Sequence, residues 1–456
     1  MKDWRDLEKE GAHYHDVGDA AGAARAYWQA MMNDKYLRSQ REHLSNYLFC
    51  IHYLDGISDD DMYVQMLLAE KLYVYPSTLS SPLHERDSHI KHLRIGFLAP
   101  SFEESSSYGF YMPLITGLSK KGMQVFCYSM KSCSFIDIPT SISTISLADM
   151  DLTAAAENIR NDNLDVLIDL GGHSAGGMTL QIASLRPAPL QISAIGWFDT
   201  TAVPAIDLVL ADKELLPNAE ALSDDGTISK DCHFTEKLLM LPHAFCYMPR
   251  EELLVASEPL TVCPEDPASS RVIFGSMQNY MKLNDSVLSL WLKLLEQMPS
   301  SKLVLQDTMT GRTTFLSDRL QRLGFPMNRL KLLDGAYHYL SNYHNIDIVL
   351  DTFPYTGGAS TAEALIMGVP VITLAGSRYG ARFSASILKS AGLPELIAHN
   401  TDEYISKAMT LAKDTSKLSR YHRTLRAHVL QSSLTDMDTY CLSFLSGIYK
   451  AMTYFK

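Results

Sequence analysis

The sequence contains no apolar run of the length that a membrane-spanning helix requires, which is about 20 residues. Its N-terminus also lacks the apolar core of a secretory signal peptide, because residues 1–6 read Met-Lys-Asp-Trp-Arg-Asp and lead into a polar helical stretch. We therefore expect a cytoplasmic protein with no membrane span.

An excess of positive charge is absent as well. The chain has 40 Lys and Arg residues against 52 Asp and Glu, for a formal net charge of −12 and a pI near 5.7. Proteins that bind nucleic acids cluster Lys and Arg on one surface, so a nucleic acid is not an expected partner. A net negative charge still allows a local basic pocket that binds one pyrophosphate.

Paired cysteines are missing, since no two cysteines have the CxxC spacing of a metal site. The dispersed set is odd in number, which is typical of reduced thiols in the cytosol. We expect structural thiols and no metal ligands. The seven cysteines are Cys50, Cys127, Cys133, Cys232, Cys246, Cys263 and Cys441.

What the chain does have is length, since 456 residues suffice for two or three domains. Residues 1–90 read as helical, with small and aromatic residues at the spacing of a tetratricopeptide helix pair. Only one such repeat is visible, and one repeat cannot bury its own face, so we expect it to pack on the next region of the chain. A plain helical cap is the alternative. The residues at this spacing are Gly11, Tyr14, Gly18, Ala23, Tyr27 and Ala30.

From residue 93 onwards short apolar runs alternate with helical stretches. The predicted strands of this part lie at 93–98, 124–128, 165–170, 190–196 and 208–210, with helices over 112–120 and 152–161. Residues 250–270 are rich in Glu, Ser and Pro and predict a linker. After it come predicted strands at 272–275, 302–305, 346–351 and 369–374, and a helix over 286–297.

Strands that alternate with helices indicate parallel sheets covered on both faces. The sequence therefore predicts an α/β fold with a helical region at 1–90, a Rossmann-like half at 91–255, a second at 256–425, and a C-terminal helix over 426–456. Ligands of such sheets bind beyond the carboxyl ends of the strands, so we expect a site in a cleft between the halves.

The most informative segment, residues 350–365, runs from a buried strand through a glycine-containing turn into a helix. Free N–H groups at a helix start bind anions, and glycines let the backbone approach a phosphate. Hydroxyls can donate to the phosphate, and an acid one turn later can hold a ribose. The alternative is an ordinary capped helix with Glu363 in a capping box. The candidate donor-binding residues here are Gly357, Gly358, Ala359, Ser360, Thr361 and Glu363.

Two other segments end strands with residues that carry chemistry. Lys282 follows the first strand of the second half, where its ammonium could neutralise charge on a departing diphosphate. His173 lies in a glycine-rich loop, where it could donate a hydrogen bond or act as a base. The alternatives are a solvated lysine and a hydrogen-bonded loop histidine.

These three segments, in this order, resemble the O-linked N-acetylglucosamine transferases and SPINDLY proteins of glycosyltransferase family 41. The resemblance runs from about residue 93 to residue 425, with further matches at 186–191, 241–247 and 392–398. The helical start also fits, as a reduced form of the tetratricopeptide repeats that precede the catalytic region in this family.

The resemblance implies a GT-B fold and metal-independent transfer, with inversion, of one sugar from a UDP-sugar to Ser or Thr of a protein. The donor is then the only small molecule required, and no further cofactor is expected. In the family, residues matching Lys282 and Gly358–Ser360 contact the donor diphosphate, and the acid matching Glu363 binds ribose. Asn279 and Arg382 stand at positions that resemble donor contacts. The acceptor could be an adhesin or a flagellin, and the chain could be an oligomer.

The chain departs from the family pattern at three places. Ser105 stands where the family has a histidine discussed as catalytic, and Ala359-Ser360 replaces a Thr-Thr pair. Tyr339, beside His338, replaces a donor-site histidine. Glu103, Glu104 and His173 are the replacement candidates for the base.

These departures leave two rival functions open beside transfer to Ser or Thr. One is transfer to Asn, as in the related adhesin N-glucosyltransferases. The other is a non-catalytic partner subunit that keeps the transferase fold, which Ser105 and Ala359 motivate.

Overall fold

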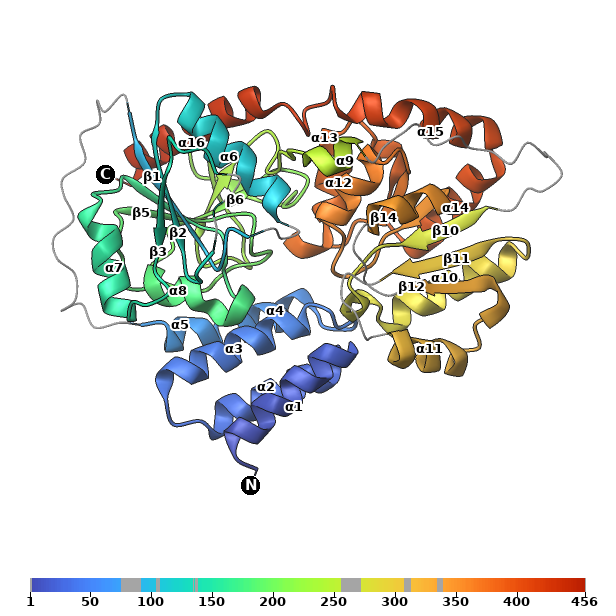
Figure 1. The fold of residues 1–456 in the computed structure, drawn as a ribbon, viewed down its shortest axis with the longest axis horizontal. Helices are drawn as coiled ribbons and strands as arrows, with labels where there is room; N and C mark the ends of the chain where they lie inside the picture. The colour runs from blue at the N-terminus through green and yellow to red at the C-terminus, as the bar shows by residue number, and fades with distance from the viewer. Residues whose placement is uncertain are drawn as a thin grey trace.

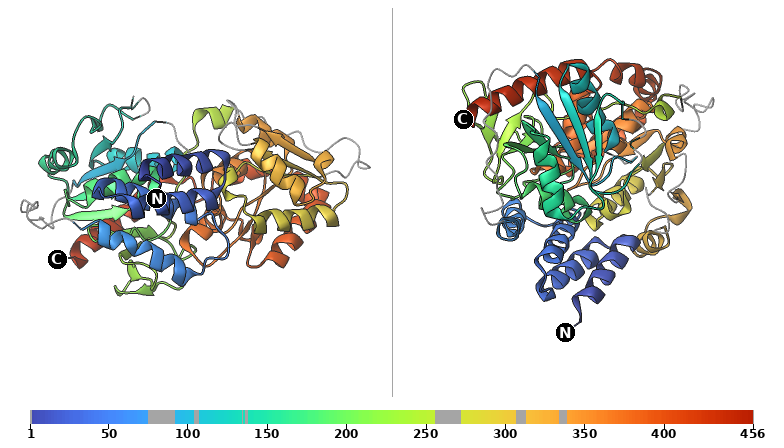
Figure 2. Two further views of the ribbon diagram at one scale, coloured as in Figure 1. Left: turned by 90° about the horizontal axis from the view of Figure 1, so that it is seen from below. Right: turned by 60° about the vertical axis from the view of Figure 1, so that its left-hand side comes forward.

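The computed structural model describes residues 2–74, 92–103, 107–133, 135, 138–255, 272–306, 313–333 and 339–455. A helical N-terminal region lies beneath two halves, which are set side by side and are each built on a wholly or mainly parallel sheet (Figure 1). A view from below shows the helical region beneath both halves (Figure 2). The predicted α/β architecture, with a helical region and two Rossmann-like halves, is confirmed.

The helical region contains α1 (Trp4–Val17), α2 (Ala20–Asn33), α3 (Leu37–Ile51), α4 (Asp59–Met66) and α5 (Leu68–Leu72). Helices α1 and α2 pack closely because glycine, which has no side chain, stands at two positions of their contact. A Cβ at Gly11 would lie 2.8 Å from the Tyr27 ring, and one at Gly22 would lie 2.7 Å from the Tyr14 ring. This is the close approach that the small-residue spacing predicts.

The helical region packs on the first half, as expected of a single repeat. A Cβ at Gly177, in the loop after β4, would overlap with the hydroxyl groups of Ser45 and Tyr73. On the other side, Ser286 of the second half donates to Asp55. The helical region therefore contacts both halves.

The first half holds a nine-stranded sheet in the order β3-β2-β1-β4-β5-β6-β9-β8-β7. Its parallel strands are β1 (Arg94–Ala99), β2 (Gln124–Ser129), β3 (Ser143–Ser146), β4 (Val166–Asp169), β5 (Leu190–Ser193), β6 (Leu208–Ala211) and β9 (Lys237–Met240). Antiparallel β8 (Ile228–Lys230) and β7 (Glu220–Ala221) extend the edge. The helices are α6 (Tyr108–Lys120), α7 (Leu152–Asn161) and α8 (Met178–Ala183). All five strands predicted for this half are present.

The second half holds a six-stranded parallel sheet in the order β12-β11-β10-β13-β14-β15. The strands are β10 (Ile273–Ser276), β11 (Lys302–Gln306), β12 (Leu330–Leu333), β13 (Ile348–Leu350), β14 (Val371–Leu374) and β15 (Ile397–Ala398). The helices are α10 (Asp285–Gln297), α11 (Thr313–Arg322), α12 (Ala359–Ile366), α13 (Phe383–Ser390) and α14 (Thr401–Lys413). When the strands of each half are numbered from one in chain order, both sheets contain the strand order 3-2-1-4-5-6 of a doubly wound Rossmann sheet.

The prediction of a single helix over residues 426–456 is wrong in its bounds. Helix α15 (Thr415–Val429) crosses residue 426, and a connection then leads to α16 (Met437–Tyr454). The last helix returns to the first half, where Cys441 occupies the space that a Cβ at Gly117 of α6 would need. Within the predicted linker, α9 (Glu251–Val255) is helical, and residues 256–271 lie outside the described residues.

Candidate active site

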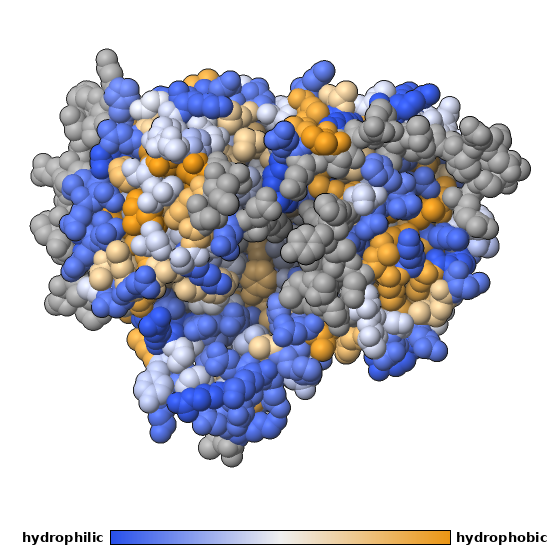
Figure 3. Space-filling model, viewed as in Figure 1, coloured by the Kyte–Doolittle hydropathy of each residue, from blue (hydrophilic) through white to orange (hydrophobic). Residues whose placement is uncertain are grey.

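A cavity of about 440 Å³ lies between the two halves and above the helical region. In the view of Figure 1, the molecular surface is hollowed between the halves (Figure 3). Its volume is in the usual range of about 300–1,000 Å³ for small-molecule sites. Six of the predicted donor-side residues line it: Asn279, Lys282, Gly358, Ala359, Ser360 and Glu363.

Asp351 shapes the turn that leads to α12. It follows β13 directly and is fully buried. Its Oδ1 accepts hydrogen bonds from the backbone N–H groups of Thr352 (2.9 Å) and Gly357 (2.8 Å), and its Oδ2 accepts from the Thr373 hydroxyl (2.7 Å). Burial raises the pKa of the carboxyl, and the hydrogen bonds from Thr373 and Gly357 are among the interactions that oppose that shift.

Gly357 and Thr361 stand behind the cavity wall rather than in it. A Cβ at Gly357 would overlap with Nε2 of Gln278 and Oγ1 of Thr361. The Thr361 hydroxyl lies 2.7 Å from the Ser384 hydroxyl, which donates to the Gly357 carbonyl at 2.9 Å. These two predicted donor contacts therefore support the turn.

Helix α12 begins at Ala359 with Gly358 as its N-cap, so Ser360 and Thr361, the N-cap residues of the capping-box alternative, lie inside the first turn. The capping-box alternative for this segment is therefore wrong. Its first residues, Ala359 and Ser360, face the cavity, where the N-terminal end of the helix dipole favours an anion. One turn later Glu363 also lines the cavity, with 5% of its surface exposed.

Lys282 follows the carboxyl end of the neighbouring parallel strand β10, in the short helical turn η3 (Tyr280–Lys282). Its Nζ donates to the Thr356 carbonyl at 2.9 Å and to Oε1 of Gln278 at 3.1 Å, and it lies 4.1 Å from the ring centroid of Tyr355. Burial lowers the pKa of the Lys282 ammonium to about 8, and the Asp351 carboxylate opposes the shift. The lysine thus reaches the turn between β13 and α12.

Gln278 links the two sides of this wall, and no sequence pattern marked it as a site residue. Its Nε2 donates to the Ser360 hydroxyl at 2.8 Å and to Asp351 at 3.2 Å, while its Oε1 accepts from Lys282. Asn279, beside it, accepts a hydrogen bond from the Met281 N–H at 3.0 Å and so holds the η3 turn. A lone glutamine in a loop carries no motif, so only its neighbours in space reveal it.

The first half supplies a strained turn to the opposite wall. Ile195 has φ +66, which is unusual for a β-branched residue, and Gly196 packs so tightly against the Leu170 carbonyl that a Cβ would overlap with it. Both residues line the cavity. Backbone strain of this kind gathers at ligand sites, where the surrounding structure maintains it.

His173 does not line the cavity. It is fully buried where the first half meets the helical region, with its Nδ1 2.8 Å from the Ser45 hydroxyl and its Nε2 2.8 Å from the Thr201 carbonyl. Burial lowers its pKa to about 4, so the ring is neutral at pH 7. This geometry favours the hydrogen-bonded loop histidine over the predicted base.

Arg382 also lies outside the cavity lining. Its guanidinium donates to the Glu214 carboxylate at 2.9 Å, to the Glu214 carbonyl, and to the Gly376 carbonyl at 2.8 Å. Because Glu214 belongs to the first half, the arginine joins the halves instead of pointing to a donor.

Two of the three replacement candidates for the base, Glu103 and Glu104, come shortly after β1 in the sequence. Glu103 is exposed and does not line the cavity, whereas Ser107 does. Glu104, Ser105 and His338 lie outside the described residues, as does the side chain of Tyr339. Within the described ranges, no cluster of potential metal ligands lines the cavity.

The model of a known family matches nearly the whole of the region that forms this cavity. The family is described as "Glycosyl transferase family 41", and the matched residues are 64–256 and 248–444. The chain belongs to glycosyl transferase family 41. This confirms the family resemblance inferred from the three sequence segments.

Relatives of this family 41 chain occur in plants. It is 31% identical over 431 residues to a protein of Hordeum vulgare, and 32% identical over 432 residues to one of Solanum lycopersicum. Both are named "Probable UDP-N-acetylglucosamine--peptide N-acetylglucosaminyltransferase SPINDLY". The alignments cover 89% of this chain but 43% and 44% of the relatives, so the chain spans less than half their length.

A solved structure with a similar fold is a lysine-to-methionine mutant of an O-GlcNAc transferase from Thermobaculum terrenum. The TM-score is 0.82 at 25% identity, and the match covers 98% of this chain and 84% of that one. The predicted GT-B type of this family 41 chain is confirmed by this similarity. No helix in the described part of the chain has the length and apolarity needed to cross a membrane.

Proposed function

We propose that this chain is a cytoplasmic protein glycosyltransferase that moves one sugar, N-acetylglucosamine or a hexose, from a UDP-sugar to Ser or Thr side chains. The observation that carries the proposal is the joint position of Lys282 and the start of α12 at one wall of the cavity. The names of the plant relatives, which specify UDP-N-acetylglucosamine and a peptide, support the same donor and acceptor classes.

The chemistry follows from the charge that develops on the donor. The acceptor hydroxyl attacks the anomeric carbon from the face opposite the diphosphate, so the bond to the diphosphate oxygen breaks with inversion. The leaving UDP gains negative charge, which the Lys282 ammonium and the N–H groups at the start of α12 can stabilise. Such preorganised donors can fulfil the role of a metal ion, and we propose a metal-independent reaction. The proton of the acceptor hydroxyl is released to solvent.

The wall also has the means to position the diphosphate. Gln278 connects Lys282 to the Ser360 hydroxyl through two hydrogen bonds, so these side chains are held in place before a ligand arrives. Glu363 lines the same cavity one helical turn further on, and we propose that its carboxylate accepts hydrogen bonds from the ribose hydroxyls. A preorganised site of this kind loses little conformational entropy on binding.

The test is intact-protein mass spectrometry of host-cell proteins incubated with the full chain and a panel of UDP- and GDP-sugars. We expect a mass gain of one sugar with a UDP-sugar and its loss in Lys282→Ala. Lys293→Ala, an exposed lysine on α10, is the matched control and should keep full activity.

Two outcomes would overturn the proposal. Peptide mapping that places the sugar only on Asn would identify an N-glycosyltransferase. If the chain binds UDP but transfers no sugar to any protein with any donor of the panel, it is a non-catalytic partner subunit.

A further inference from the structure

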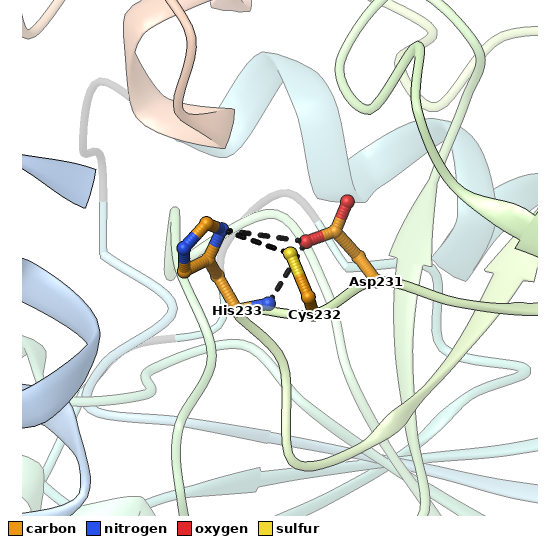
Figure 4. Close-up of side chains that lie close together, drawn as sticks. All are labelled: Asp231, Cys232 and His233. Carbon is orange, nitrogen blue, oxygen red and sulfur yellow. Dashed lines mark hydrogen bonds and ion pairs between the residues drawn. The ribbon is translucent and has the colours of Figure 1, made fainter. Parts of the chain in front are cut away.

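A second group of chemically active side chains lies away from the cavity, in the loop between β8 and β9. Asp231, Cys232 and His233 are consecutive, yet their side chains converge because the loop bends there (Figure 4). The Cys232 Sγ lies 3.4 Å from Nδ1 of His233, which lies 3.8 Å from Oδ1 of Asp231. All three ligand atoms lie within 4.8 Å of one another.

These separations suit a tetrahedral metal ion. Zinc–nitrogen, zinc–oxygen and zinc–sulfur bonds of about 2.0–2.3 Å place neighbouring ligands about 3.3–3.8 Å apart. The two distances from Nδ1 of His233 fall in that range. Thiolate, imidazole and carboxylate together are a ligand set for a borderline transition-metal ion such as Zn²⁺.

A fourth residue, from a different region of the chain, orients the histidine. Nε2 of His233 lies 2.9 Å from Oδ1 of Asp60, at the start of α4. When Nε2–H donates to this carboxylate, Nδ1 is left unprotonated, and its lone pair points towards Cys232. A carboxylate that holds the other ring nitrogen is the usual outer partner of a metal-binding histidine.

The surroundings favour a cation and give it access. The carboxylates of Asp231 and Asp60 lie on either side of the His233 ring, 3.8 and 2.9 Å from its two nitrogens, so the charge around the group is negative. Cys232 is exposed and the His233 side chain keeps 31% of its surface exposed, so an ion can enter from solvent.

We propose that Asp231, Cys232 and His233 bind one transition-metal ion of the Zn²⁺ class, with Asp60 holding His233 from outside. On binding, the Cys232 S–H bond breaks, its proton passes to solvent and the sulfur–metal bond forms. The fourth coordination position faces solvent. The ion polarises the imidazole and strengthens its hydrogen bond to Asp60, which fastens α4 to the first half.

This site is independent of the proposed transferase function, since none of its residues lines the cavity. From the absence of CxxC pairs we expected no cysteine to be a metal ligand. The CxxC criterion tests only for pairs of cysteines, so it does not detect a site in which one cysteine combines with its two sequence neighbours. Of the part of the chain that the structure describes, this is the one group with such geometry.

The test is titration of the full chain, without an affinity tag, with Co²⁺ and then Zn²⁺. We expect one cobalt ion per chain with a thiolate-to-cobalt charge-transfer band in the near ultraviolet, displaced by Zn²⁺. Cys232→Ser should abolish the band, whereas Cys133→Ser, the matched control at a half-buried cysteine, should retain it. Asp60→Asn should keep the stoichiometry and lower the affinity about 10–100-fold.

The thermal unfolding midpoint separates binding from misfolding. Zn²⁺ should raise it for the parent chain and leave it unchanged for Cys232→Ser, while the metal-free midpoints of the two agree. Absence of a charge-transfer band, or a band that survives Cys232→Ser, would overturn the site. An unchanged affinity in Asp60→Asn would overturn the role of Asp60.

Discussion

The Lys282 ammonium lies 4.1 Å from the centre of the Tyr355 ring, although 72 residues of sequence separate them. Lys282 follows β10 and Tyr355 follows β13, and these two strands are parallel neighbours. They are the strands at which the order of the sheet reverses, where doubly wound sheets form their ligand crevice. The contact between the two residues is therefore a consequence of topology.

The first prediction concerns pH. The pKa of Lys282 falls from the ordinary 10.5 to about 8 in the free protein, so the side chain loses its charge as the pH rises above 8. A diphosphate binds best to the charged form, so we expect UDP affinity to fall by up to about tenfold per pH unit above pH 8. Isothermal titration calorimetry across pH 7–10 measures this fall.

The control for this pH dependence is Lys282→Arg, whose guanidinium stays charged throughout. We expect its affinity, whatever its absolute value, to be nearly independent of pH in the same range. A parent chain that shows no alkaline loss of UDP affinity would contradict the placement of Lys282 at the diphosphate.

The second prediction uses the two adjacent glycines as a matched pair. Gly357→Ala should lower the thermal unfolding midpoint and abolish UDP binding, because the new methyl group overlaps with Gln278 and Thr361. Overpacking of this kind costs typically about 1–3 kcal/mol. Gly358→Ala should leave the midpoint unchanged, since the nearest atom to its Cβ is 3.9 Å away, on Phe110. Equal midpoints for the two variants would refute the overlap behind the turn.

The third prediction separates structure from catalysis at His173. Replacement by Ala removes the hydrogen bond to the buried Thr201 carbonyl, which should cost about 1–3 kcal/mol of stability, and leaves the Ser45 hydroxyl with the Tyr73 hydroxyl as its remaining partner. We expect a lower unfolding midpoint, with the pH profile of kcat/KM unchanged at temperatures where the variant is folded. A base would show the opposite pattern, a normal midpoint with a lost limb of the pH profile.

The fourth prediction distinguishes two roles for Arg382. If it acts only through its ion pair with Glu214, then Arg382→Ala and Glu214→Ala should change UDP affinity by the same small factor, and the double variant should add nothing. If Arg382 binds the donor, as the family resemblance implies, only its own replacement should weaken UDP binding. Calorimetric titration of the three variants with UDP decides between these results.

Much of the fold follows from local pattern. The apolar runs that predict β1, β2 and β4 are buried on both faces of a parallel sheet, so they have a strong signal in the sequence. β3 was missed because it is a polar edge strand with mostly exposed side chains. The antiparallel β7 and β8 were missed because they have only two and three residues, too few for a period to appear.

The sequence by itself determined the family, the alternation of strands and helices, and the turn before α12, because each depends on neighbouring residues and on residue type. Tertiary structure alone decided which polar side chains meet. It brought Gln278 between Lys282 and Ser360, moved His173 to the contact with Ser45, and paired Arg382 with Glu214 across the halves. Such pairs arise from strand order and domain packing, which join residues that are far apart in the chain and leave no periodicity or spacing to mark them.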